Sequence, residues 1–490
     1  MPRTAPYLLP AALFVLIPIC ARSLPAQDFS HDSAQPAAQA PLIQQANDAL
    51  ANGDYTGALK LLSAVNGQLP NNPQVLYDIG LALDALSDAA SSAASSPSAA
   101  NGAATAASSD PAASSSSSNG APPPTTAEAA YRAAIAADAN FAPPHVALGL
   151  LLARNGHSAD ARAEFDAALA LTNIAAPLKA RALRARARLE LSGDLAHSLP
   201  PDPTAASADL LAALKLVPEQ PEDILLSAQI AEATPDLPAA ERAYRRYLAL
   251  PGNAAEPAAT AALAHLLLIQ RHPADAEALL DPAHAAHPDN PAFTAQLAQA
   301  WIDSGDPSKI ARAVPLVESL HTANPSNAAV TRLLARVYVA TGQQEKADPL
   351  YAGLIARDPK PSDPTLATDY ADLLIRQHRP AEAEKLLKQA LANPHSYATP
   401  ADEADAALHL AFAAQDIDDP KTTLQALALS ATLQPPSPPA LFLEATANDA
   451  LHQSSQAVEN YKKFLAASAG KYPDQESQAR QRLAALQHAK

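Results

Sequence analysis

The sequence predicts an all-α fold in which short pairs of helices repeat along the chain and stack on one another. Two features of the composition favour this fold. Of the 490 residues, 48% are hydrophobic, but alanine accounts for much of that fraction and only 4% of the residues are aromatic. A large globular core needs more bulky side chains, whereas alanine-rich chains form helices that approach one another closely. The sequence contains 14 glycines and few long β-branched runs, so we expect little β-sheet.

A pattern of small and bulky residues repeats around Gly53, Gly156 and Gly342. A small residue stands seven positions before each glycine, and small, bulky and apolar residues follow five, nine and twelve positions after it. In chain order, these residues are Ala46, Ala58, Leu62 and Val65; Gly149, Ala161, Phe165 and Ala168; and Ala335, Ala347, Tyr351 and Leu354. Offsets that alternate between three and four place them on the facing sides of two helices joined by a short turn.

Eleven units of this kind follow one another between about residue 39 and residue 468, at a spacing of about 34 residues. The pattern resembles the tetratricopeptide repeat family across nearly the whole chain after its N-terminal segment. This resemblance implies a right-handed superhelical solenoid, in which each helix pair buries its apolar faces against the next pair. Stacking is needed because isolated helices of about a dozen residues are only marginally stable.

Residues 1–26 have the layout of a secretory signal peptide of bacterial type. A basic residue precedes an apolar stretch at residues 8–19, and small residues surround Ala26. Because the apolar stretch is too short to span a bilayer comfortably, we expect cleavage after about Ala26, with an uncleaved anchor as the alternative. Lipidation of Cys20, the only cysteine, is a second alternative, although Ile19 stands where a bacterial lipoprotein motif has a small residue.

The rest of the chain divides by composition into a helical array with one insertion. Residues 87–126 form a Ser/Ala/Pro-rich tract that cannot bury enough apolar surface to fold, so we predict a disordered insertion. It enters between the two helices of the second unit, where an insertion disturbs packing least. The predicted segments are a flexible N-terminus (27–38), the first repeat with the first helix of the second (39–86), the insertion (87–126), the remaining array (127–468) and a capping helix (469–490).

Two details of the array depart from a simple repeat. Thr125, with Glu128 three residues later, predicts a capping box that starts the helix after the insertion. Arg186 falls where the fourth unit should have a small residue, so this unit fits the pattern least well.

The sequence predicts no catalytic residues, no cofactor and no metal site. It contains none of the common nucleotide-binding, metalloprotease or nucleophile-elbow motifs. His284 and His287 are close enough in sequence to share a helical face, but no third ligand is spaced to join them. We therefore interpret them as residues of a helix C-terminus.

Charge also limits the partners that we expect. A net charge of −16 disfavours binding to nucleic acid or to anionic lipid. We therefore interpret the basic stripe of Arg181, Arg184 and Arg188 as a solvated helix face with acidic partners rather than as a nucleic-acid site.

The family resemblance implies a binding surface on the first helix of each unit. In tetratricopeptide repeat proteins, these helices line a concave groove that accepts a peptide or a partner helix. The candidate groove contacts implied here are Tyr77, Leu81, Arg332, Arg336, Arg376, Phe412 and Phe442. Arg332 and Arg336 are four residues apart and should point together, so that with Arg376 they could hold a carboxylate or an acidic peptide. The alternative is an ion pair within the array, with Asp369 or Asp372.

We therefore predict a non-enzymatic protein–protein interaction scaffold of the periplasm or cell envelope, acting in assembly, secretion or polysaccharide export. The expected partners are proteins. We expect no nucleic acid, and a membrane only if Cys20 is lipidated or the signal peptide is retained. Two alternatives stay open: a lipid-anchored envelope assembly factor, and the substrate-recognition subunit of a hydrolase.

Overall fold

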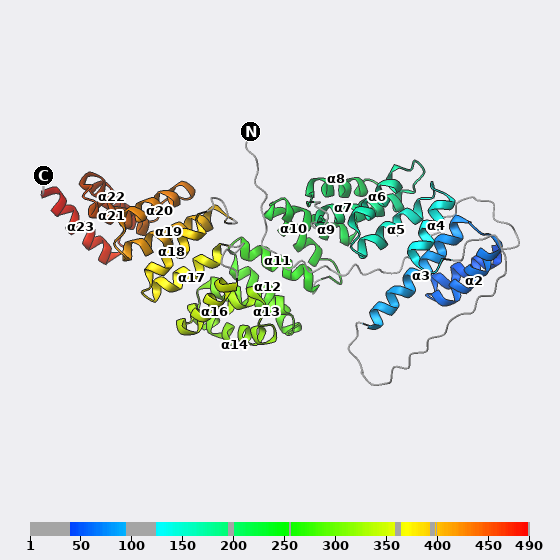
Figure 1. Cartoon of the computed structure of the whole chain (residues 1–490), viewed down its shortest axis with the longest axis horizontal. Helices are drawn as coiled ribbons and strands as arrows, with labels where there is room; N and C mark the ends of the chain where they lie inside the picture. Colours follow the sequence, from blue (N-terminus) through cyan, green and yellow to red (C-terminus); the bar gives the residue numbers. More distant parts are fainter. Residues whose placement is uncertain are drawn as a thin grey trace. The chain divides into compact units, whose positions relative to one another are not determined.

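Helices dominate the computed structural model of the chain. The described residues form 23 α-helices and contain no β-strand, which confirms the all-α prediction (Figure 1). The described segments are 40–94, 124–194, 200–253, 256–357, 364–392, residue 397 and 399–488. The predicted signal peptide (1–26) with Cys20 and the predicted flexible segment (27–38) lie outside these segments.

The helices fall into two compact units, and the division between them lies inside α11, after Ala259. In the N-terminal unit, helices alternate as the first and second members of consecutive pairs, and the two members of each pair pack together. In chain order these helices are α1 (Ala40–Ala51), α2 (Tyr55–Gln68), α3 (Pro73–Ala94), α4 (Ala127–Ala137), α5 (Ala142–Arg154), α6 (Ser158–Ala170), α7 (Ala176–Ser192), α8 (Pro203–Leu214), α9 (Pro221–Ala233) and α10 (Leu237–Leu248).

The C-terminal unit continues the alternation and ends with a single helix, α23, at the place of the predicted capping helix. Its helices are α11 (Pro257–Ile269), of which all but the first turn belongs here, α12 (Pro273–Ala286), α13 (Pro291–Ser304), α14 (Pro307–Ala323), α15 (Ala328–Ala340), α16 (Gln344–Arg357), α17 (Thr365–Arg376), α18 (Pro380–Ala390), α19 (Pro400–Asp416), α20 (Pro420–Leu433), α21 (Pro438–Ala450), α22 (Ser454–Ser468) and α23 (Pro473–His488). Chain order therefore gives eleven helix pairs among the described residues, followed by α23.

Contacts beyond neighbours in the chain join the first helices of successive pairs. In the N-terminal unit they join α3 to α5, α5 to α7 and α7 to α9, and in the C-terminal unit α13 to α15, α15 to α17, α17 to α19 and α19 to α21. The first helices from α3 to α9, and those from α13 to α21, therefore form one continuous side of their unit. We call this side the inner face. Its presence in both units confirms a solenoid of tandem helix pairs.

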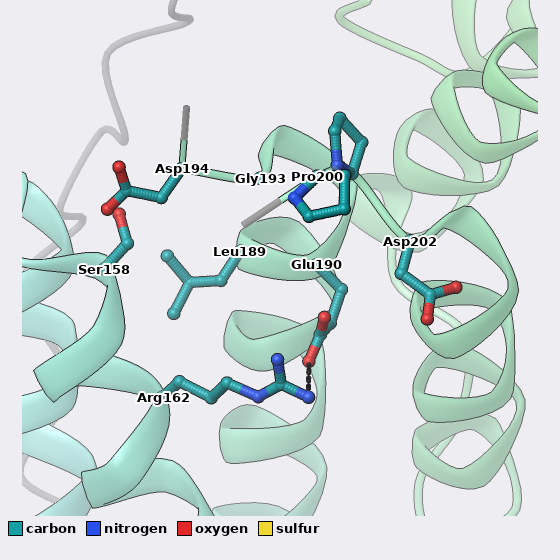
Figure 2. Close-up of a pocket in the computed structure, with 9 residues that line it drawn as sticks. Ser158, Arg162, Leu189, Glu190, Gly193, Asp194, Pro200 and Asp202 are labelled. Carbon is teal, nitrogen blue, oxygen red and sulfur yellow. Dashed lines mark ion pairs between the residues drawn. The ribbon is translucent and has the colours of Figure 1, made fainter. Parts of the chain in front are cut away.

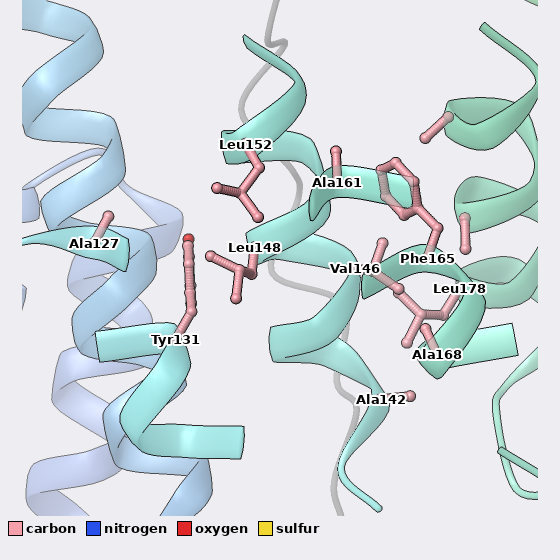
Figure 3. Close-up of a cluster of buried hydrophobic side chains, with 12 residues drawn as sticks. Ala127, Tyr131, Ala142, Val146, Leu148, Leu152, Ala161, Phe165, Ala168 and Leu178 are labelled. Carbon is pink, nitrogen blue, oxygen red and sulfur yellow. The ribbon is translucent and has the colours of Figure 1, made fainter. Parts of the chain in front are cut away.

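The predicted small and bulky positions meet inside each pair. A Cβ atom on Gly149 of α5 would lie 2.6 Å from the ring of Phe165 of α6, and one on Gly80 of α3 would lie 2.4 Å from the ring of Tyr131 of α4. Figure 3 shows Tyr131 and Phe165 in one buried cluster, with Leu148 of α5 pointing toward Tyr131. At the equivalent position other first helices carry alanine with no exposed surface, as in Ala46, Ala228, Ala298, Ala335, Ala371, Ala411 and Ala445.

The turn inside a pair requires a left-handed backbone. Gly53, Gly156 and Gly342 have φ angles of 79°, 79° and 76°, which glycine adopts without steric cost. In the C-terminal unit His378 and His452 take this place, with φ angles of 57° and 59°. These residues carry a Cβ atom, so their turns are strained.

The start of the insertion differs from the prediction. α3 continues to Ala94, so residues 87–94 are helical instead of belonging to a disordered tract. Alanine and serine at these positions permit a helix, and Arg154 of α5 holds it by ion pairs to Asp84 and, at 2.6 Å, to Asp88. Residues 95–123 lie outside the described segments.

The N-cap of the helix after the insertion lies one residue later than predicted. The N-cap is Thr126, not Thr125, and its hydroxyl accepts a hydrogen bond of 3.2 Å from the Ala129 amide. The hydroxyl therefore satisfies one of the free amides at the start of α4.

Arg186 explains why the fourth unit lacks a small residue. Its guanidinium donates two hydrogen bonds of 2.7 Å to Asp209 of α8 and one of 2.5 Å to Asp166 of α6. In this pair, the ion pairs from Arg186 to two second helices therefore replace the close helix contact found in other pairs.

Candidate binding surface

The inner face of each unit carries arginines whose partners lie on adjacent first helices. These helices pack their apolar side against the second helices, so their other side is left for polar side chains. Arg154 of α5 reaches back to Asp84 and Asp88 of α3, whereas Arg184 of α7 reaches forward to Asp223 of α9. Each such ion pair joins one repeat to the next.

In the C-terminal unit, the two arginines predicted to act together point in opposite directions. Arg332 donates 2.7 Å hydrogen bonds to Asp369 and Thr365 of α17. Arg336 donates a 2.6 Å hydrogen bond to Gln299 of α13 and lies 3.7 Å from Asp303. The structure therefore does not bring Arg332 and Arg336 together as a carboxylate clamp. It contains the alternative that the sequence left open, an ion pair within the array.

Arg376 is also paired, through a 2.8 Å contact to Asp372 one turn earlier on α17. Asp372 lies 3.6 Å from the ring of His409 of α19. Burial lowers the pKa of His409, but the hydrogen bond to Asp372 and one to the Asp405 carbonyl outweigh burial, so the pKa of His409 is raised overall. This contact joins two repeats, and no sequence pattern predicts it.

The predicted aromatic and apolar contacts are only half exposed. Tyr77 of α3 packs against the rings of Tyr131 and Phe141, with centroid distances of 5.9 and 5.8 Å. Leu81, one turn later, packs against the same cluster. Contacts with two aromatic rings therefore fix the position of the Tyr77 ring.

Near the C-terminus, the two predicted phenylalanines have different surroundings. Phe442 of α21 packs against Phe464 and Tyr461 of α22 at 5.1 and 6.3 Å, so it mainly completes the core of the last pair. Phe412 is half-buried on α19, and its neighbour along the helix, Ala411, occupies the close-contact position.

The basic stripe of α7 is not a uniformly solvated face. Arg184 donates two hydrogen bonds of 2.6 Å to Asp223, whose side chain has no exposed surface. Arg188 is exposed, whereas Arg181 is half-buried and has no carboxylate partner among the described residues. The expected acidic partner is therefore confirmed for Arg184, but this ion pair is largely buried instead of solvated.

Asp78 of α3 is a buried carboxyl. It is 4% exposed, and its Oδ1 atom accepts a 2.9 Å hydrogen bond from Gln74, while Oδ2 has no partner in the described part of the chain. Burial raises the pKa of Asp78 to about 7, although the Gln74 hydrogen bond opposes this shift. Its position between the apolar residues Val75 and Ala82 is the sequence signal that could have predicted burial.

Two open hollows lie among the helices. One, of about 290 Å³, lies beside the ends of α6 and α7, where Arg162 forms a 2.9 Å ion pair with Glu190 (Figure 2). The other, of about 460 Å³, is lined by His284, Trp301 and Arg312, and the Arg312 guanidinium stacks 4.5 Å from the Trp301 ring.

Neither a metal-binding cluster nor a membrane-spanning helix is found in the described segments. No group of three or more His, Cys, Asp or Glu residues there could hold a metal ion, and no helix there is long and apolar enough to cross a bilayer. His284 contacts the Thr294 hydroxyl at 3.4 Å, and the ring of His287 lies 6.3 Å from that of Phe293.

Comparisons with known proteins identify repeats in both units. The tetratricopeptide repeat family model matches residues 43–111 and residues 308–363. No curated protein sequence matches the chain significantly.

Several solved structures are similar to this chain in fold. The crystal structure of the APC/C hetero-tetramer Cut9–Hcn1 has a TM-score of 0.48 and 13% identity, and covers 91% of this chain and 84% of that chain. A tetratricopeptide repeat protein from Parabacteroides merdae has a TM-score of 0.38 and 15% identity, with coverage of 55% and 98%. The tetratricopeptide repeat domain of P58(IPK) has a TM-score of 0.33 and 15% identity, with coverage of 92% and 98%.

Proposed function

Because this chain is a tetratricopeptide repeat protein, we propose that it is a non-enzymatic scaffold that binds partner polypeptides on its inner face. The family supports a role in protein–protein interaction. The observation that carries the proposal is the unbroken series of first helices within each unit. Each of these helices adds polar and half-buried apolar side chains to one side, so an extended partner can contact several repeats at once.

We place this scaffold in the periplasm or cell envelope, where it would serve assembly, secretion or polysaccharide export. The support is the basic, apolar and small-residue order of residues 1–26. Mass spectrometry of the protein purified from cells tests this placement. A mature chain that begins near Gln27 would agree with it, whereas an acylated Cys20 would identify a lipid-anchored envelope factor instead.

Site-specific photo-crosslinking in cells tests the binding surface. A photoreactive amino acid replaces Leu225, a half-buried residue of the first helix α9 that lies one turn after the exposed Glu222. The matched control places the same amino acid at Arg242, which is exposed on α10, the second helix of the same pair. We expect crosslinked partner proteins from the Leu225 position alone. Equal crosslinking from both positions would contradict an inner binding face.

A further inference from the structure

One ion pair between successive first helices uses a cation that can lose its charge near neutral pH. Elsewhere on the inner face these contacts use arginine: Arg154 between α3 and α5, Arg184 between α7 and α9, Arg336 between α13 and α15, and Arg332 between α15 and α17. An arginine keeps its charge at every physiological pH. Between α17 and α19 the cation is His409, whose Nε2 atom lies 3.6 Å from Oδ1 of Asp372. This contact therefore depends on protonation.

The two ring nitrogens of His409 face different acceptors. Nδ1 lies 2.8 Å from the main-chain carbonyl oxygen of Asp405, one turn earlier on α19. A carbonyl oxygen only accepts, so Nδ1 must carry a hydrogen. In the neutral ring Nε2 then has no hydrogen, and its lone pair would face the carboxylate of Asp372. In the protonated ring Nε2 carries a hydrogen toward that carboxylate, so the geometry favours the charged form.

The carboxylate of Asp372 lies between one permanent and one titratable cation. Its Oδ2 atom accepts a 2.8 Å hydrogen bond from Arg376 of the same helix, and its Oδ1 atom faces His409. On α19 itself, the charge of Asp405 also favours the protonated ring. The charged side chains of the other helices packed against α19 are exposed or interact with other partners: Glu382, Glu384, Lys385 and Lys388 of α18, Lys421 of α20, and Glu444 and Asp449 of α21.

The direction of the pKa shift of His409 agrees with this geometry. Burial lowers the pKa, but the contacts with Asp372 and Asp405 raise it overall above its ordinary value of 6.5. The folded chain therefore binds this proton more tightly than the unfolded chain does. The resulting stabilisation is complete below pH 6.5 and is lost as the pH rises through the raised pKa.

We infer that His409 is a pH-sensitive switch between the repeats of α17 and α19. In its protonated form, the ion pair with Asp372 joins the two first helices and holds this part of the inner face together. After the proton is lost, the ring and the carboxylate no longer attract each other, and the two helices separate more readily. The switch belongs to the array itself and requires no partner, so it goes beyond the proposed scaffold function.

NMR titration of the full chain measures the protonation of His409 directly. Selective isotope labelling of histidine at Cε1 gives one signal for each ring, and the signal missing from the spectrum of His409→Gln or His409→Arg belongs to His409. We expect its midpoint in the wild type to lie above pH 6.5. Asp372→Asn, which removes the charge and keeps the shape of the side chain, should lower this midpoint.

Hydrogen exchange of the full chain measures the consequence for the array. After correction for the intrinsic effect of pH on exchange, we expect α17 and α19 to open about two- to fivefold more often at about pH 8.5 than at about pH 5.5, as suits a partly exposed ion pair. The helices α13 and α15, which Arg336 joins, serve as the internal reference and should show no such change.

Three variants distinguish the switch from a merely structural histidine. His409→Arg places a permanent cation beside Asp372, so α17 and α19 should stay protected at both pH values. His409→Gln should give the faster opening at both pH values. The matched control is His321→Gln, which removes a half-buried histidine of the same unit whose ring contacts the Thr331 hydroxyl at 3.3 Å. This control should keep the pH dependence of the wild type.

Two results would overturn the inference. They are a midpoint of His409 at or below pH 6.5, and an equal pH dependence of α17 and α19 in the wild type and in His409→Gln. If neither variant of His409 folds, the wild type alone decides: a pH effect confined to α17 and α19 supports the switch, and its absence overturns it. The scaffold function is tested separately, by crosslinking at Leu225.

Discussion

The inner faces of the two units use the same kind of ion pair but leave different groups unpaired. In the C-terminal unit, Arg332 and Arg336 bind residues of α17 and α13, so the arginines tie three successive first helices together. In the N-terminal unit, Arg154 and Arg184 tie repeats in the same way, but Arg181 has no such partner. An arginine on this surface is therefore first a contact between repeats, although Arg181 and Arg188 of α7 form no ion pair in the described segments.

The units also differ in how their second helices are joined to the next repeat. In the C-terminal unit, three aromatic donors of first helices bind carboxylates of the preceding second helices: Trp301 to Glu277 at 3.0 Å, Tyr338 to Glu318 at 2.7 Å and Tyr370 to Asp348 at 3.1 Å. In the N-terminal unit, Tyr244 binds Glu232 at 2.7 Å within its own pair. Similar repeats are therefore reinforced by different polar contacts.

The largest expected effect on stability comes from breaking the buried ion pair between Arg184 and Asp223 of the N-terminal unit. Asp223 has 0% and Arg184 16% exposed side-chain surface, whereas Asp369 and Arg332 both have 25%. We expect Asp223→Ala to lower the free energy of unfolding locally by about 3–5 kcal/mol, because it leaves a buried charge unpaired. Asp369→Ala in the other unit should cost about 1 kcal/mol. Hydrogen exchange of α7–α9 and α15–α17 in the full chain measures both effects, and equal losses would contradict the distinction.

A pH dependence should follow from Asp78 in the N-terminal unit. The pKa of Asp78 is about 7 in the folded chain, above its usual value of 3.8. Between these values the folded state binds more protons than the unfolded state, so the stability of the first pairs should fall as pH rises from about 4 to 7. Asp78→Asn should remove a dependence on the order of 3 kcal/mol. Urea unfolding followed across this pH range tests it, and an unchanged profile in the variant would argue against the assignment.

A smaller effect on stability is expected from the close packing at Gly149. The same substitution at Gly353, which has no close neighbour, serves as the control and should change stability in the opposite direction. Gly149→Ala places a methyl group 2.6 Å from the Phe165 ring, which should destabilise the N-terminal unit by about 2 kcal/mol. Gly353→Ala, in α16 of the C-terminal unit, meets no atom within 4 Å and should stabilise its helix by about 0.5–1 kcal/mol. Thermal unfolding of both variants checks the pair. Destabilisation of similar size by both would show that loss of glycine, rather than contact with Phe165, is responsible.

The smallest expected effect concerns the turns. His378 has a φ angle of 57° where the N-terminal unit has Gly156 at 79°. We expect His378→Gly to stabilise the C-terminal unit by about 1 kcal/mol and Gly156→Ala to destabilise the N-terminal unit by a similar amount. Melting temperatures of the two variants provide the measurement, and a shift in the same direction for both would refute the strain argument.

The parts of the fold that depend on nearby residues were predictable from the sequence. Gly149 and Phe165 are 16 residues apart and lie in one pair, so their complementary sizes are visible as a repeated spacing. The end of α3 was not predictable in this way, because Asp88 is held by Arg154, which is 66 residues away across the insertion. Local composition favoured a disordered tract there, and a long-range ion pair favoured the helix.

The candidate surface was predicted less well for the same reason. Arg332 and Arg336 share a helical face, but their partners lie 37 residues ahead and 37 residues behind, about one repeat in each direction. An acid or amide about one repeat away from each arginine is therefore the sequence feature that could have predicted both contacts. The isolation of Arg181 depends on what is absent around it, which sequence spacing does not show.

The ion pairs from Arg154 to α3 have a practical consequence for engineering this chain. Arg154 connects α3 and α5, the first helices on either side of α4. These ion pairs involve only residues outside 95–123, and they hold together the repeat into which that segment is inserted. Lengthening a connection costs little additional closure entropy once its two ends are anchored. Residues 95–123 are therefore a natural position for grafting a reporter domain, and the array should tolerate such cargo.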